Sequence, residues 1–150
     1  MPRFATLSDV IATDEAKQQV VADCQALIEQ QVSATSGVGG MALKAAFKTV
    51  TTLAPGYYES RVEKLVPDLL KRLQPFWADF QTAGGGQFGD YLQSRAQEVA
   101  DSVLAVTDLR AQRSNRTAVT SVYKAVRGSA VEHIQAALPA VGALVEKYAA

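Results

Sequence analysis

The stretch Ala46-Phe47-Lys48-Thr49-Val50 returns, 76 positions later, as Val122-Tyr123-Lys124-Ala125-Val126. In both regions a proline between aliphatic residues follows, in Val66-Pro67-Asp68-Leu69 and in Leu138-Pro139-Ala140-Val141. This second match has an offset of 72, so the two copies differ by four residues between their blocks. A pattern that recurs within one chain is typical of a duplicated structural unit. The sequence therefore predicts two related helical units.

Apolar residues recur at helical spacing on both sides of a glycine-rich seam. The spacing predicts six helices, over residues 14–33, 41–53, 57–73, 87–112, 117–127 and 130–148. No segment shows the alternation of a strand, so the predicted fold class is all-α. We expect a single helical domain over residues 1–150, a six-helix bundle built from two pseudo-repeated three-helix units. The units cover about 9–74 and 87–148, and a linker covers about 75–86.

Pro67 and Pro139 lie at equivalent positions inside the third and sixth predicted helices. A proline inside a helix removes a backbone hydrogen bond and bends the helix, at a cost of about 3 kcal/mol. At the same offset Leu73 aligns with Val145, which extends the match along one helix face. We therefore expect the two bent helices to pack against each other near a pseudo-twofold axis.

The composition is that of a globular protein, with 48% hydrophobic and 20% charged residues among 150. Fifteen basic and fifteen acidic residues cancel, so no overall field attracts nucleic acid or an anionic membrane. No apolar run is long enough for a membrane-spanning helix, and the first residues lack the apolar core of a signal peptide. We expect a soluble cytoplasmic protein without integral membrane association and without nucleic-acid partners.

The chemically reactive residues are few and isolated. His133 is the only histidine, and no nucleophile or acid stands at a spacing that would complete a catalytic group. Cys24 lies on the apolar stripe of the first helix beside Asp23, where a small buried residue is expected and a reactive thiolate is not. No cluster has the ligand spacing of a metal site. We predict no catalytic residue, no metal ligand and no cofactor, and a protein that is not an enzyme.

Gly37, Gly39 and Gly40 precede a helix that carries Lys44 and Lys48 and no acid. Backbone N–H groups at a glycine-rich helix start can hold an anion, and nearby lysines would strengthen such a site. No strand precedes these glycines, which argues against a nucleotide-binding loop. The simpler interpretation is a turn whose glycines let two helices pack closely. We favour the turn and keep the five residues as a possible anion or partner contact.

The segment 107–128 is the one strongly polarised region, with five bases against a single acid, Asp108. Arg110, Arg113 and Arg116 form its centre, and we treat them as a possible anion or partner contact. Such a patch could hold a phosphate, an acidic partner or the acidic end of a second copy. The alternative interpretation is a solvated face whose arginines complement a helix end.

Phe76, Trp77, Phe80 and Phe88 form the densest aromatic group and flank the flexible stretch Ala83-Gly84-Gly85-Gly86. Large aromatic side chains in a chain of this size are usually core anchors. The alternative is a hydrophobic patch for a partner, or a lid over a pocket.

The chain resembles an uncharacterised family of small all-helical bacterial proteins that has no assigned activity. The resemblance is carried by residues 32–48, by Ala54-Pro55-Gly56, by residues 104–108 and by residues 122–128. It covers most of the chain from about residue 30 onward. It implies a compact bacterial cytoplasmic domain and supplies no catalytic residue.

Three functions are compatible with these observations. The first is a non-enzymatic protein that acts through protein–protein interaction or self-assembly, as a homo-oligomer or with a protein partner. The alternative is small-molecule or lipid binding in an apolar pocket between the two helical units. The weakest is an enzyme that combines an anion site at 37–48 with the arginines at 110–116, because no base or nucleophile is evident.

Overall fold

The computed structural model describes residues 6–53, 55–84, 86–113 and 117–149. These residues form one short 3-10 helix and seven α helices, with no strand among them. The elements in chain order are η1 (Leu7–Ile11), α1 (Asp14–Ala34), α2 (Gly37–Leu53), α3 (Tyr57–Ala83), α4 (Phe88–Ser94), α5 (Ala96–Gln112), α6 (Thr117–Arg127) and α7 (Ala130–Ala149). The all-α prediction is confirmed.

The helix boundaries differ from the predicted six helices in the middle of the chain. α3 continues through Pro67 and Pro75 to Ala83, so most of the expected linker is helical. The helix expected over 87–112 is divided at Arg95, whose backbone (φ −122°, ψ 36°) leaves the helical region. The described chain therefore has seven α helices where six were predicted.

Contacts of the Arg95 side chain explain the break between α4 and α5. Its guanidinium donates to Asp79 Oδ2 of α3 at 3.0 Å, to the Tyr91 hydroxyl of α4 at 2.8 Å and to Glu98 Oε2 of α5 at 2.6 Å. It also lies 4.8 Å from the centre of the Phe76 ring. One side chain thus joins three helices at the corner where the chain turns.

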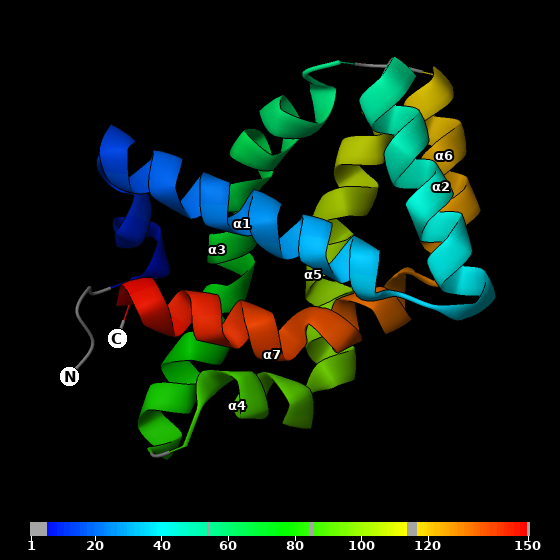
Figure 1. Ribbon diagram of the computed structural model, residues 1–150. Coiled ribbons are helices and arrows are strands. Elements are labelled where there is room, and N and C mark those ends of the chain that lie inside the picture. Colours follow the sequence, from blue (N-terminus) through cyan, green and yellow to red (C-terminus); the bar gives the residue numbers. More distant parts are fainter. Residues whose placement is uncertain (1–5, 54, 85, 114–116, 150) are drawn as a thin grey trace.

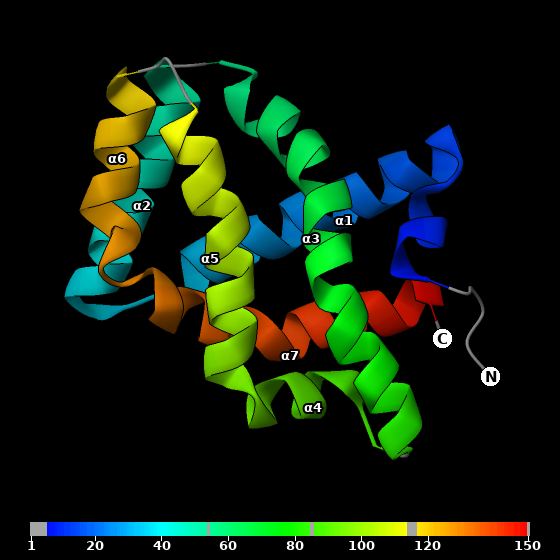
Figure 2. The ribbon, with the colours of Figure 1, turned by 180° about the vertical axis from the view of Figure 1, so that it is seen from behind.

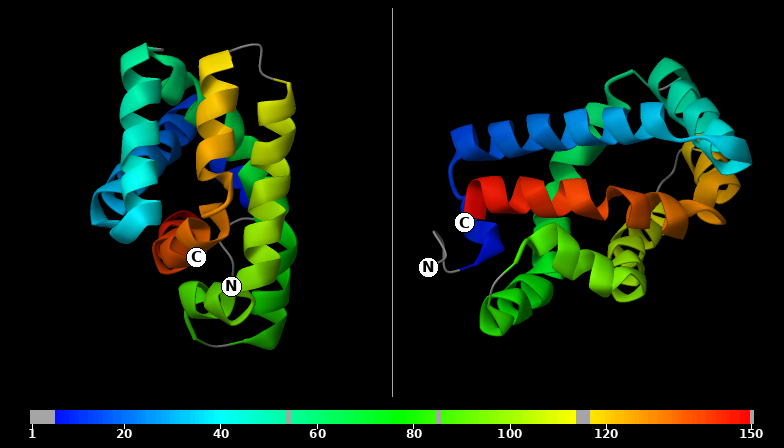
Figure 3. Two further views of the ribbon diagram at one scale, coloured as in Figure 1. Left: turned by 90° about the vertical axis from the view of Figure 1, so that its right-hand side faces the viewer. Right: turned by 60° about the horizontal axis from the view of Figure 1, so that its bottom comes forward.

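The helices cross as two antiparallel pairs (Figure 1). α1 and α7 run side by side in opposite directions across one face of the molecule. α3 and α5 form the second pair, which is seen most clearly from behind (Figure 2). α2 and α6 pack on each other at one end, while η1 and the end of α7 meet at the opposite end (Figure 3).

The tightest helix contact in the described chain joins α4 to α7. Gly89 and Gly142 face each other there, and a Cβ built on Gly142 would lie 2.2 Å from the backbone N and Cα of Gly89. Phe88 and Leu92 of α4 are fully buried beside this contact. The Phe88 N–H donates to Glu146 Oε1 of α7 at 2.7 Å, which fixes the start of α4 on α7.

The backbones of α3 and α7 do not come into close contact within the described residues, so the expected direct packing of the two proline-containing helices is not found, although buried side chains of both belong to one core. Pro139 instead packs on Gly89 of α4. The reason is geometric: α7 already has α4 in backbone contact on one side, and α1 and η1 hold α3 away on another. Side chains of α3 and α7 nevertheless face a common space.

Candidate functional site

An apolar cavity of about 170 Å³ lies between η1, α1, α3 and α7. Every lining residue carries a hydrocarbon side chain except Cys24 and Tyr148. The walls are Leu7 and Val10 of η1; Val20, Cys24, Leu27 and Ile28 of α1; Val66, Leu69, Leu70 and Leu73 of α3; and Val141, Leu144, Val145 and Tyr148 of α7. Each long wall follows helical spacing, so one apolar face of each helix is turned to the cavity.

Two of the walls come from segments that the sequence repeat aligns. Leu69 and Val141 are separated by the 72-residue offset, and so are Leu73 and Val145. All four side chains line the cavity, the first of each pair from α3 and the second from α7. The cavity therefore lies between one helix of the first predicted unit and one of the second.

A polar cluster lies next to the cavity, on the outer side of Tyr148. The Tyr148 hydroxyl donates to the Asp23 carboxylate of α1, and Lys147 Nζ donates to Asp23 Oδ2 at 2.8 Å. Hydrogen bonds from Lys147 and Tyr148 lower the pKa of Asp23 below its usual range. Burial, followed by the bond to Asp23, raises the pKa of Tyr148. At neutral pH the cluster thus holds a carboxylate, an ammonium and a neutral phenol.

Cys24 lines the apolar part of the same cavity. Burial, together with the neighbouring Asp23 charge, raises the pKa of its thiol to about 11. The thiol is therefore protonated at neutral pH, where the nucleophilic thiolate is almost absent. Cys24 contributes a small apolar surface to the wall, as the sequence predicts.

η1 covers one side of the cavity. Leu7 and Val10 are both buried, and Leu7 is only 1% exposed. The Leu7 N–H donates to Gln74 Oε1 of α3 at 2.6 Å, which fixes η1 over α3. A five-residue helix is thus held by two buried side chains and one hydrogen bond to the long helix.

The predicted glycine contact lies at the opposite end of the molecule. α2 begins at Gly37, so the glycines are part of the helix rather than of a turn before it. A Cβ on Gly40 would lie 2.8 Å from the Thr35 backbone, and one on Gly39 would lie 3.4 Å from the Ser129 Cβ. These distances show that the glycines permit close packing between α1, α2 and the start of α7. Lys44 and Lys48 are exposed on α2.

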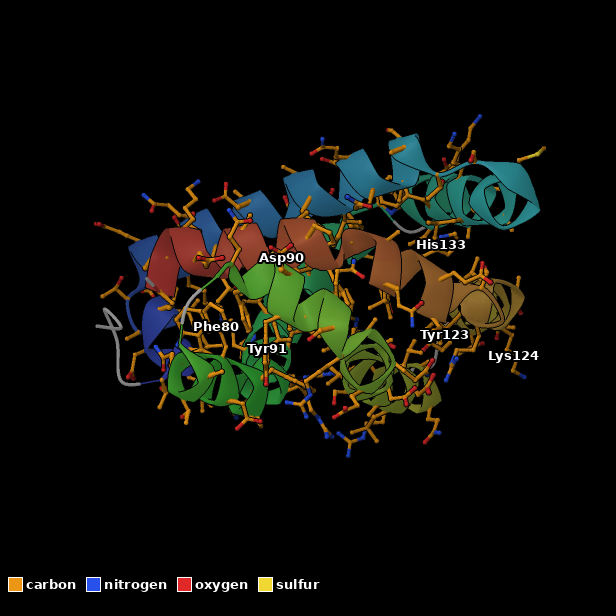
Figure 4. The ribbon with its side chains drawn as sticks, turned by 90° about the horizontal axis from the view of Figure 1, so that it is seen from below. Phe80, Asp90, Tyr91, Tyr123, Lys124 and His133 are labelled. Carbon is orange, nitrogen blue, oxygen red and sulfur yellow. The ribbon has the colours of Figure 1, made fainter. Side chains whose placement is uncertain are left out.

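His133 has a neighbour that the sequence analysis missed. Its Nε2 lies 3.2 Å from Ser129 Oγ, and Gly39 of α2 packs next to both side chains. The spacing of four residues at a helix start would have revealed the pair. Among the described residues no carboxylate bonds the imidazole, which a serine–histidine catalytic group requires. Figure 4 shows His133 far from the aromatic side chains at the other end.

The aromatic group lies in the core rather than on the surface. Trp77 is 3% exposed and Phe88 is 0% exposed, and Phe76 is also buried. The Trp77 and Phe88 rings meet edge to face, with their centres 4.9 Å apart. The ring of half-buried Phe80 has its centre 5.6 Å from that of the Tyr91 ring (Figure 4). The rings therefore join α3 to α4, and they do not form a patch or a lid.

The predicted arginine patch is divided between two helix interfaces. Arg127 Nε donates to Asp108 Oδ1 at 2.9 Å, between α6 and α5. Arg110 Nη2 of α5 donates to Asp68 Oδ2 of α3 at 2.6 Å. Arg113 is exposed at the C-terminal end of α5. Arg116 lies outside the described residues.

The structure does not bring the glycine and arginine parts of the predicted anion contact together. α2 packs on α1, α3 and α6, and no packing contact between α2 and α5 is present in the described chain. Instead Arg110 and Arg113 share a groove with Lys71 and Arg72 of α3. The sequence analysis missed those two residues because it looked for an excess of bases within one continuous segment. α3 contains both acids and bases, so it shows no such excess.

Neither a metal cluster nor a spanning helix is found in residues 6–53, 55–84, 86–113 and 117–149. No group of three His, Cys, Asp or Glu side chains there could hold a metal ion. No helix in this part of the chain combines the length and the hydropathy that crossing a membrane requires.

The fold and the cavity together define an all-helical protein with a partly open apolar cavity lined by helices from both parts of the chain. The model of a family of unknown function, DUF6918, matches residues 7–149, and the chain belongs to that family. This confirms the resemblance to a family without assigned activity. No match is found among curated proteins or among solved structures.

Proposed function

We propose that the protein is a non-enzymatic binding protein that holds a small apolar ligand in the cavity between α1, α3 and α7. The supporting observation is an apolar space of about 170 Å³ at the centre of four elements. Protein interiors are packed with few voids larger than a water molecule. An apolar occupant would remove the lining side chains and its own surface from water, which the hydrophobic effect favours.

The size of the cavity limits the ligand. An engineered apolar cavity of about 150 Å³ is known to stay dry and to bind benzene. The present cavity is of the same order, and it is smaller than the ~300–1,000 Å³ typical of drug-sized ligands. We therefore infer an occupant of roughly six to eight carbon atoms, or the end of a longer chain. A whole lipid would not fit.

The polar cluster limits the charge of the ligand. Asp23 stays ionised at neutral pH, because Lys147 and Tyr148 lower its pKa. An anionic head group next to Tyr148 would meet this carboxylate and lose favourable hydration. A neutral polar end, such as a hydroxyl or an amide, loses less hydration than a charged group and can lie at the open side of the cavity. The proposed ligand class is a short neutral amphiphile or a hydrocarbon.

A matched pair of probes tests the proposal. We expect 1-hexanol to shift the methyl resonances of cavity-lining leucines and valines saturably in NMR titrations, and hexanoate to bind at least about tenfold more weakly, a difference of about 1.4 kcal/mol. Leu144→Phe and Leu69→Phe each fill the cavity and should abolish binding. Leu109→Phe on α5, where the side chain is 44% exposed, is the control and should bind normally.

Either of two results would contradict cavity binding: no saturable shift with 1-hexanol, or equal shifts in the wild-type protein and both cavity-filling variants. Thermal unfolding of all variants, followed by circular dichroism, separates lost binding from lost folding. Leu109→Phe and Leu144→Phe add the same volume, so only their positions differ.

Self-association is the second proposed function. Met41 is 72% exposed on α2, one helical turn from Lys44 and two from Lys48, and this face combines apolar and cationic groups. Such a face would suit an acidic surface on a second copy of the chain. Native mass spectrometry across ionic strengths tests it. A dimer that dissociates with salt and is lost in Met41→Lys supports the proposal, while a monomer at low salt and high concentration removes it.

We also propose that the two units descend from one duplicated unit. The packing supports this: α1 contacts α3 and α7, α5 contacts α7 and α3, and α2 contacts α6. The pattern of contacts is unchanged when α1 is exchanged with α5, α2 with α6 and α3 with α7. The test is an exchange of equivalent wall residues, Leu73→Val with Val145→Leu. The double variant should be more stable than the sum of its single effects predicts, and simple additivity would count against equivalence.

A further inference from the structure

A second recess lies on the other side of α3 from the cavity. It is a groove of about 300 Å³ between α3 and α5, which run side by side there (Figure 2). Four cations line it: Lys71 and Arg72 from α3, and Arg110 and Arg113 from α5. The single acid in the groove is Asp68. Two helices distant in sequence thus bring their basic residues to one place.

The charges of the groove are not balanced by its own acid. Arg110 pairs with Asp68 at 2.6 Å. Asp68 also lies four residues before Arg72, a spacing suited to an intrahelical ion pair, but its carboxylate is used by Arg110. Lys71, Arg72 and Arg113 have no ion pair within the described parts of the chain. The groove therefore keeps three uncompensated positive charges in a protein whose formal net charge is zero.

Within the described chain, no ion pair stabilises the three exposed cations Lys71, Arg72 and Arg113. Like charges that share one recess repel each other, and exposed ion pairs return at most about 1 kcal/mol. The Asp68–Arg110 pair does fix one guanidinium in the groove and connects the two helices. A ligand with several negative charges would be attracted by all three remaining cations at once, and it would offset their mutual repulsion.

The residue types favour phosphate over other anions. Arginine presents a planar fork of N–H donors that matches two phosphate oxygens, and lysine adds a mobile point charge. A terminal diphosphate group concentrates about two to three negative charges in a small volume, whereas carboxylates would need several separate side chains. Extended nucleic acid fits poorly. Proteins that bind it usually contact many phosphates along the strand, and those that bind single strands also stack bases on aromatic side chains. Among the described residues that line it, the groove has four cations and no aromatic residue.

We propose that the groove between α3 and α5 binds a diphosphate or triphosphate group, held by Lys71, Arg72, Arg110 and Arg113. Val106 and the partly exposed Leu109 form the apolar part of the same groove and can contact the organic portion of the ligand. The group can belong to a soluble metabolite or to a lipid head group, since the chemistry recognised is the same. This site is independent of the apolar cavity, which lies across α3.

Calorimetric titration of the intact protein with inorganic pyrophosphate tests the site. We expect saturable binding that weakens as salt rises, and much weaker binding of inorganic phosphate. Arg72→Gln and Arg113→Gln should each lower the affinity about tenfold or more, since a hydrogen bond to a charged group contributes that much. Lys71→Gln should lower it to a smaller extent.

Lys124→Gln on α6, which does not line the groove, is the matched control for Lys71→Gln. Both replace an exposed helical lysine and change the net charge equally, so only Lys71→Gln should weaken pyrophosphate binding. Equal weakening by the two variants would show non-specific charge attraction and overturn the site. Absence of pyrophosphate binding at low ionic strength would overturn it as well. Unfolding midpoints of the variants confirm that the fold is intact.

Vesicles separate the two sources of the phosphate group. Phosphatidylcholine vesicles with and without a bisphosphorylated inositol lipid are sedimented with the protein. Binding to the second kind only, with release by pyrophosphate, assigns the group to a head group. Pyrophosphate binding without vesicle binding assigns it to a soluble ligand. If polyglutamate binds more tightly than pyrophosphate and displaces it, the groove recognises an acidic protein segment and the phosphate proposal fails.

Discussion

The two sides of α7 are packed in opposite ways. Towards α4, Gly142 and Gly89 bring the backbones so close that no Cβ fits between them. Towards α3, branched side chains of both helices face each other and still leave about 170 Å³ between them. Both sides use common aliphatic residues and belong to one helix. The residue types on the two sides therefore do not account for the cavity. It exists because α1 and η1 keep α3 at a distance from α7.

The comparison separates a part of the molecule that is expected to be rigid from one that is expected to accept additional atoms. A larger side chain on the α4 side of α7 would have to displace the backbone of α4, which costs folding free energy. Volume added on the α3 side enters free space. The same logic applies to removal, because a side chain deleted beside a cavity enlarges it instead of allowing collapse. Substitutions on the two sides should thus differ in sign as well as in size.

The largest effect is expected from Gly142→Ala on the tight side. The new Cβ would lie 2.2 Å from backbone atoms of Gly89, and neither backbone is free to move without separating α4 from α7. We expect a loss of at least about 3 kcal/mol in the free energy of unfolding, measured by urea denaturation. Gly128→Ala is the control. No atom lies within 4 Å of a Cβ there, so its effect should stay within about 1 kcal/mol.

Leu73→Ala on the cavity side comes next. Deletion of a buried leucine side chain beside an existing void should cost about 3 kcal/mol. The distinguishing result is rescue: saturating 1-hexanol should restore more stability to this variant than it adds to the wild-type protein. Leu104→Ala on α5, buried but remote from the cavity, should lose similar stability without such rescue. Equal rescue of both variants would contradict the position of the ligand.

The positions of most helices could be predicted from the sequence because they rest on local signals. The helix predicted over 14–33 is α1, and it begins where the Thr13 side chain accepts a hydrogen bond from the Ala16 N–H. The break at Arg95 could not be predicted, since the apolar spacing continues through it and neither glycine nor proline marks it. That break depends on Asp79, Tyr91 and Glu98, which reach the guanidinium from three helices.

The candidate sites could be predicted less well than the helices. The apolar faces of α1, α3 and α7 are evident in the sequence. The same faces could also pack directly on one another, and no cavity would then form. Its existence depends on distances between helices, which periodicity does not contain. Arg110 and Arg113 were identified from local charge, whereas Lys71 and Arg72 become their neighbours only through the α3–α5 packing.

Val141→Leu is expected to have a smaller effect, in the stabilising direction. The added methylene enters the cavity and should raise the free energy of unfolding by about 0.8 kcal/mol, while it weakens 1-hexanol binding. The same change at Val99, which is fully buried in α5 away from the cavity, should destabilise the fold by about 1–3 kcal/mol through overpacking. Chemical denaturation of both variants compares free and filled space directly. Loss of stability at both positions would show that the cavity cannot accept a methylene.

The smallest effect is expected from Asp23→Asn at the polar end of the cavity. Hydrogen bonds from Lys147 and Tyr148 lower the folded-state pKa of Asp23 below its value in the unfolded chain. The ionised carboxylate therefore contributes stability above the unfolded pKa of about 3.9, and that contribution is lost as the pH falls through the lower folded pKa. Asp23→Asn should reduce stability at pH 7, and its difference from the wild-type protein should shrink in acid.

Urea unfolding of both proteins across acidic and neutral pH measures this dependence. Asp90→Asn removes an exposed carboxylate that has no bonded partner in the described chain, so it should show no comparable trend. If Asp23→Asn behaves like Asp90→Asn, the cluster does not hold α1 to α7.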